Sequence, residues 1–302
     1  RSAIHALHRS VRMQIGIIGL GRRTGANVAR RLLRVGHRCV VFDHRPVAVE
    51  ELARDGAIGF ATPEELVRSL QHPRVVLLML PAEAVEPILA AISSSLEPGD
   101  TIVDASNSHP GDDIRRARTF SARRQHYVDV GISGDSLARD RGYCLMIGGE
   151  GAGVTPLTPL FESLAHAPAE SLGAPGDESS PCEVVRGYLH CGAPGAGHQV
   201  KRVHDAIEHA VMEAYAEGLN ALRHPGSSAA SADPGSYVFD VAAIACLWCR
   251  GSVIESNLLE LAAAALRHDP EASAWGDRAS EWAESGPASN VETSAGPPPR
   301  RT

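Results

Sequence analysis

The stretch Met13–Gly25, MQIGIIGLGRRTG, decides the fold. Its apolar part, QIGIIG, has the length and isoleucine content of a buried strand, and the following Thr24–Val35 repeats apolar side chains at helical spacing. A strand, a glycine turn and a helix bring backbone N–H groups close to a pyrophosphate, although G-x-G-x-x-x-G is one residue longer than the usual motif. The stretch therefore predicts a dinucleotide site. Its expected contacts are Gly19, Leu20, Gly21 and Gly25.

The next apolar run, CVVFD, ends at Asp43, 18 residues after Gly25. An acid at about this distance is expected to meet the adenosine ribose hydroxyls, and its charge favours NAD because it repels a 2'-phosphate. His44 and Arg45 follow directly and can offer that phosphate a positive partner. The sequence therefore predicts NADP or NAD as cofactor and leaves the choice open.

Residues 14–150 alternate short apolar runs with helical stretches, which is typical of an open parallel sheet. The expected strands are QIGIIG, CVVFD, RVVLLML, DTIVDAS, YVDVGIS and YCLMIGG. The expected helices are Thr24–Val35, Pro63–Leu70, Ala82–Ile92, Asp112–Arg124, Val200–Leu222 and Phe239–Leu266, with no strand after Gly195. We predict an α/β Rossmann-type doubly wound N-terminal domain followed by an all-α C-terminal domain.

Composition marks the domain limits. A Pro-, Gly- and Ser-rich loop over 165–181 separates the sheet region from the helices. We expect a tail over 1–12, a dinucleotide-binding domain over 13–190, a helical substrate and dimerisation domain over 191–270, and a poorly ordered, truncated tail over 271–302.

Charge and composition exclude several functions. The 302 residues are 43% hydrophobic and 22% charged, which is typical of a globular protein. The net charge of -7 argues against a nucleic-acid partner, and the apolar runs are too short to span a membrane. The pair Cys246 and Cys249 has no second CxxC or nearby histidine to complete a metal site. We expect a cytoplasmic protein without a metal.

Lysine occurs once, at Lys201, among 29 basic residues that are otherwise arginines. Lysine can lose its proton at accessible pH, whereas a guanidinium stays protonated. Lys201, His204, Asp205 and Glu208 recur at i, i+3, i+4 and i+7, and therefore form a polar row on one helix face that could supply a base and an acid. A solvated charged face is the alternative. An apolar stripe that we expect to pack runs beside the row: Val200, Val203, Ile207, Val211, Ala214 and Gly218.

Four long segments carry a family resemblance. They are MQIGIIGLG, YVDVGISG with RGYCLMIGGE, GYLHCGAPGAGHQVKRVHDAIEHAVMEAYAEGLN, and WCRGSVIES. Over about Met13–Pro270 the chain resembles the short decarboxylating form of 6-phosphogluconate dehydrogenase, in the β-hydroxyacid dehydrogenase superfamily. That family oxidises a sugar acid's 3-hydroxyl by hydride transfer to a nicotinamide cofactor, releases CO2 and protonates an enediol, which gives ribulose 5-phosphate. The resemblance implies a homodimer or homotetramer acting in the pentose phosphate shunt and gluconate utilization.

The resemblance also implies roles for single residues. Lys201 matches the general base, and Glu208 the acid that protonates the enediol. Implied substrate contacts are Asn107, Ser133, Gly134, His204, Asp205 and His209. Further implied cofactor contacts are Leu80, Pro81, Ala82 and Asn107.

Several of these positions depart from the family pattern. The family has a glycine at the position of Asp135, an asparagine at that of Asp205 and a phosphate-binding tyrosine at that of His209. The nucleotide loop has an extra residue among 22–24. The family's C-terminal phosphate ligands are not recognisable in ESGPASNVETSAG. Three hypotheses follow: a decarboxylating 6-phosphogluconate dehydrogenase, a catalytically impaired homologue that binds a dinucleotide, and a related β-hydroxyacid dehydrogenase for a non-phosphorylated acid.

Overall fold

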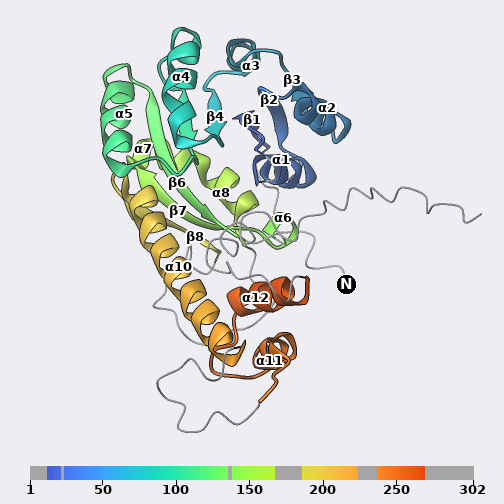
Figure 1. Ribbon diagram of the computed structural model, residues 1–302. Helices are drawn as coiled ribbons and strands as arrows, with labels where there is room; N and C mark the ends of the chain where they lie inside the picture. Colours follow the sequence, from blue (N-terminus) through green and yellow to red (C-terminus); the bar gives the residue numbers. More distant parts are fainter. Residues whose placement is uncertain (1–11, 22–23, 135–137, 167–185, 224–236, 269–302) are drawn as a thin grey trace, which may run out of the picture. The chain divides into compact units, whose positions relative to one another are not determined.

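The computed structural model describes residues 12–21, 24–134, 138–166, 186–223 and 237–268 (Figure 1). The chain divides into two compact units, Arg1–Ala206 and Ile207–Thr302, and each is described by itself. The C-terminal tail, most of the N-terminal tail, Asp135 and the extra loop residues at 22–23 lie outside the described residues. The predicted domain boundaries stay a prediction.

The described part of the first unit is built on an eight-stranded sheet (Figure 1). Its strands are β1 (Gln14–Ile18), β2 (Arg38–Phe42), β3 (Ile58–Gly59), β4 (Val75–Leu78), β5 (Thr101–Asp104), β6 (His126–Ser133), β7 (Cys144–Gly149) and β8 (Tyr188–Gly192). They follow the order β3-β2-β1-β4-β5-β6-β7-β8 and pair in parallel, except for the antiparallel pair β6 and β7. The strand order reverses between β1 and β4, and ligands of such sheets bind at the carboxyl ends of the strands beside this point.

Helices cover both faces of the sheet. They are α1 (Thr24–Val35), α2 (Pro46–Arg54), α3 (Pro63–Ser69), α4 (Ala82–Ile92), α5 (Pro110–Ala122), α6 (Ala138–Arg141), α7 (Gly151–Val154) and α8 (Thr158–Leu164). One apolar core contains residues of α1, α2 and α8, and a second contains residues of α3, α4 and α5. Burial on both faces explains the continuous apolar runs of β1 and β4. The doubly wound α/β prediction is confirmed.

The six predicted strands are present, but β3 and β8 are not among them. β3 has two residues, both exposed, and β8 is an edge strand in which Leu189 and His190 are exposed. A short or half-exposed strand lacks the continuous apolar run that marks the central strands, because one side of it stays in water.

The second unit is helical in its described part. It contains most of α10 (Ala196–Arg223), together with α11 (Val241–Trp248) and α12 (Asn257–His268), around a core that includes Met212, Ala245 and Leu259. The all-α prediction is confirmed. The single helix predicted over Phe239–Leu266 is wrong, because α11 ends at Trp248 and Gly251 has a left-handed φ of 77°. No helix in the described ranges is long and apolar enough to cross a membrane.

Candidate active site

The loops after β1, β2, β4 and β5 are tied together at the carboxyl edge of the sheet. The N–H of Gly19 donates to the carbonyl oxygen of Phe42 at 2.9 Å, and the N–H of Leu80 donates to Ser106 Oγ at 3.1 Å. A Cβ at Gly19 would lie 2.5 Å from the carbonyl oxygen of Met79, and its φ is 91°, so only glycine fits. The structure therefore brings the predicted glycine turn and the predicted loop at Leu80, with Pro81 and Ala82 after it, to one edge of the sheet, where a dinucleotide is expected.

Asp43 is turned into the protein, with its side chain only 2% exposed. Its Oδ2 accepts the N–H of Leu20 at 2.7 Å, and its Oδ1 accepts the backbone N–H and the Nε–H of Arg45 at 2.9 and 3.1 Å. Burial raises the pKa of Asp43, but these hydrogen bonds outweigh burial and hold the pKa below its usual value. The groups exposed here are the side chains of His44 and Arg45, at 84% and 41%. Arg45 also donates to the carbonyl oxygen of Gly21, so it lies beside the glycine turn.

Asn107 is presented by a turn at the end of β5. Its φ of 53° is left-handed, which is uncommon outside glycine, and its side chain is exposed. The residues on either side are buried and bind the buried carboxylate of Asp104. Oδ1 accepts the N–H of Ser106 at 3.0 Å, and Oδ2 accepts the hydroxyl of Ser108 at 2.8 Å. Asp104, which the sequence did not single out, therefore fixes the shape of the turn that exposes Asn107.

A buried carboxylate also holds the N-terminus of α10. Asp129, in β6, accepts the N–H of Gly195 at 2.7 Å and that of His198 at 3.0 Å, which is the favoured place for a negative charge on a helix. Burial raises the pKa of Asp129, and these two hydrogen bonds oppose the rise. Gly197 allows the close approach, because a Cβ there would lie 2.5 Å from the carbonyl oxygen of Met146. This close approach explains why the GAPGAG segment has a glycine at position 197.

The following turn places Lys201 against β6. A Cβ at Gly131 would lie 2.5 Å from Lys201 Cβ, and two residues further along the strand Ser133 Oγ lies 3.2 Å from His204 Nε2. The Lys201 side chain is 11% exposed and its Nζ donates to Asp205 Oδ1, which also lies 3.0 Å from His204 Nδ1. Lys201, His204 and Asp205 of the predicted polar row are therefore connected to one another and to Ser133. The predicted Gly134 directly follows Ser133 and is exposed.

The apolar stripe predicted beside this row does not pack as expected. Val200, Val203 and Ile207 are 42%, 53% and 60% exposed, and the buried apolar residues of α10 are Met212 and Leu219. Within the first unit the reason is that the contacts of Gly131 and Gly197 turn Lys201, and not the neighbouring Val200, toward the sheet.

Glu208 and His209 lie on α10 within the second unit. His209 Nε2 is 3.1 Å from Glu213 Oε1, one helical turn further on. The roles predicted for Glu208 and His209 stay predictions.

Known proteins resemble this chain in sequence and fold. The family model described as the NAD binding domain of 6-phosphogluconate dehydrogenase matches residues 14–173. The NAD(+)-dependent, decarboxylating 6-phosphogluconate dehydrogenase of Haloferax volcanii is 36% identical over 258 residues, which cover 85% of this chain and 76% of that protein.

Two solved structures share the fold. The 6-phosphogluconate dehydrogenase of Plasmodium falciparum has a TM-score of 0.66 at 24% identity, and the match covers 83% of this chain but 50% of that one. The 3-hydroxyisobutyrate dehydrogenase of Mycobacterium tuberculosis has a TM-score of 0.60 at 21% identity, and the match covers 90% of this chain and 93% of that one.

Proposed function

Because the chain belongs to the 6-phosphogluconate dehydrogenase family, we propose that it oxidises and decarboxylates 6-phosphogluconate to ribulose 5-phosphate and CO2. The family model and the relatives confirm the predicted resemblance. The chain is therefore an oxidoreductase of the 6-phosphogluconate and hydroxyacid dehydrogenase type that uses NAD or NADP. The observation that supports the specific reaction is the place of the sole lysine. Lys201 lies in a polar row against β6, in the same compact unit as the glycine turn.

The residues of the candidate site have distinct roles in this proposal. A cofactor held with its pyrophosphate at the glycine turn would supply the hydride acceptor, and Lys201, as the neutral amine, would take the proton of the substrate hydroxyl. In this proposal the sugar acid is held by Asn107, Ser133 and His204. Ser133 and His204 present hydrogen-bonding groups close to Lys201, and Asn107 presents its amide from the turn after β5. Glu208 returns a proton to the enediol carbon after CO2 is lost.

The substrate assay tests the reaction. With 6-phosphogluconate and NADP or NAD, the purified protein should release CO2 and reduced cofactor in equal amounts. A kcat/KM for gluconate close to that for 6-phosphogluconate would instead favour the hydroxyacid dehydrogenase hypothesis. The pairing of His209 with Glu213 supports that hypothesis, because the Glu213 carboxylate beside His209 repels a substrate phosphate. If neither acid gives reduced cofactor, the result would support the impaired homologue.

We further propose that the protein prefers NADP. The carboxylate of Asp43 is occupied by Leu20 and Arg45, with His44 Nδ1 at 3.3 Å, and has little surface left for ribose hydroxyls. The side chains of His44 and Arg45 remain exposed, and they can supply the cations that a 2'-phosphate needs.

Arg45→Gln should raise the KM for NADP about 10- to 100-fold, because a hydrogen bond to a charged group contributes about 1.5–3 kcal/mol. The KM for NAD should change less than about threefold, since NAD has no phosphate at that position. The exposed Arg54, at the end of α2, provides the matched control Arg54→Gln, which should leave both constants unchanged. A wild-type preference for NAD would contradict the proposal.

A further inference from the structure

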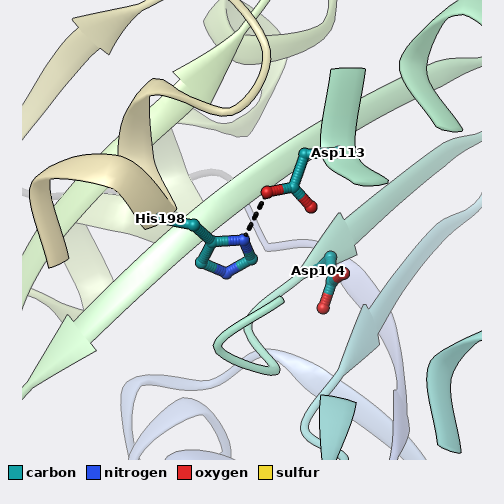
Figure 2. A group of neighbouring side chains, drawn as sticks. All are labelled: Asp104, Asp113 and His198. Carbon is teal, nitrogen blue, oxygen red and sulfur yellow. Dashed lines mark hydrogen bonds and ion pairs between the residues drawn. The ribbon is translucent and has the colours of Figure 1, made fainter. Parts of the chain in front are cut away.

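A buried polar cluster connects α10 with the segment that carries Asn107. His198 is 1% exposed, and both Asp104 and Asp113 are fully buried. His198 Nδ1 lies 2.8 Å from Asp113 Oδ2, and Figure 2 shows this bond with Asp104 beside it. One ligand atom from each of the three side chains lies within 4.8 Å of the others. The cluster therefore joins residues that are far apart in the sequence.

The two carboxylates already have partners of the opposite polarity. Tyr127 Oη lies 2.6 Å from Asp104 Oδ2 and 2.9 Å from Asp113 Oδ1. Arg116 Nη1 lies 3.1 Å from Asp104 Oδ2 and 3.8 Å from Asp113 Oδ1. This guanidinium supplies the positive charge that a metal ion would otherwise bring, so the donor set fits an ion-pair network better than a metal site.

His198 is oriented by Asp113. Its Nε2 is buried and has no hydrogen-bond partner among the described residues, so the bond through Nδ1 sets the direction of the ring. Burial lowers the pKa of His198, but Asp113, together with Asp104 and Asp129, outweighs burial and holds the pKa above its usual value. The ion pair therefore makes its full contribution to the free energy of unfolding at a pH below the ordinary histidine pKa. This contribution is lost as the pH rises through the raised pKa of His198.

We propose that His198 and Asp113 are positioning residues that fix the first turn of α10 to the first turn of α5, which follows the turn that carries Asn107. His198 lies one helical turn before Lys201, and Asp113 shares Tyr127 with Asp104, which shapes the turn of Asn107. The pair thus keeps the amine of Lys201 and the amide of Asn107 at a fixed separation. The inference rests on the proposed function, because it assigns both groups to one substrate.

The test compares Asp113→Asn, His198→Gln and the double variant with the wild type. Each change keeps the approximate shape and removes the charge, so kcat should fall about 10- to 100-fold, as expected when a reacting group moves by about 1 Å. Cofactor Kd should stay within about twofold, because the glycine turn is untouched. The double variant should lose no more than either single variant, since the two side chains act as a unit. His190→Gln is the matched control, because His190 is exposed and its ring bonds the carbonyl oxygen of Gly149.

A second measurement does not depend on activity. Lys201 is the sole lysine, so its labelling by trinitrobenzenesulfonate, mapped by peptide mass to exclude the terminal amine, reports on one side chain. Both single variants should label several-fold faster than the wild type and His190→Gln. Folded variants with wild-type kcat and labelling would overturn the proposal. A wild type without dehydrogenase activity would overturn the proposed function, whereas faster labelling in the variants would still support the positioning role.

A measurement on the unmodified protein covers the case in which a variant misfolds. In histidine 15N NMR, the Nδ1–H of His198 should exchange slowly with solvent because it is buried and bonded to Asp113. A His198 ring proton that exchanges as fast as that of an exposed histidine would overturn the pairing.

Discussion

Lys201→Arg should lower kcat by about 100- to 10,000-fold and leave the cofactor Kd within about twofold. The expected range is that of a general base, and arginine keeps the positive charge that pairs with Asp205 but does not give up its proton. The contacts described for Lys201 are with Gly131 and Asp205 and not with the glycine turn, so cofactor binding should persist. Stopped-flow or steady-state measurement of reduced cofactor gives kcat, and fluorescence titration gives Kd.

Chemical rescue makes this test specific to the amine. In Lys201→Ala, added ethylamine should restore part of the activity with a saturable dependence on its concentration, because the small amine can occupy the space left against Gly131. The exposed neighbour Arg202 provides the control Arg202→Gln, which should keep wild-type kcat and show no rescue. Normal turnover by Lys201→Arg would rule out the lysine as the base.

Gly197→Ala should destabilise the first unit by about 3 kcal/mol and abolish most turnover. A Cβ at this position would lie 2.5 Å from the carbonyl oxygen of Met146 and 2.7 Å from that of Asp129, and backbone atoms cannot move aside as a flexible side chain does. The helix must shift away from β6 and β7, and Lys201 shifts with it. Urea unfolding followed by circular dichroism measures the change in stability.

The same helix provides the control. A Cβ at Gly218 would meet no atom within 4 Å, and Gly218 lies inside α10. Gly218→Ala should therefore stabilise the protein by about 0.5–1 kcal/mol, since alanine loses less backbone entropy than glycine in a helix. If Gly197→Ala unfolds at the wild-type urea concentration, α10 does not approach the sheet as closely as described.

The central part of the fold was predictable because its signals are local. The bounds of α1 and α4 match the predicted ranges, since the apolar spacing and the flanking glycine or proline belong to the same short segment. The break between α11 and α12 was not predictable in the same way. Apolar residues continue across it, and the left-handed conformation of Gly251, three residues after the end of α11, is recognised from its backbone angle.

The candidate site was also predictable only where its signals are local in the sequence. The sequence by itself singled out the lone Lys201 and the polar row, because lysine count and helical spacing are properties of the chain. Only the tertiary structure decided that Lys201 and His204 of this row face β6, because the orientation of the first turns of α10 depends on Gly131 and Asp129, which lie on a distant strand. The buried acid–histidine pair is likewise invisible in sequence, since burial and pairing arise from contacts between segments that spacing along one helix does not encode.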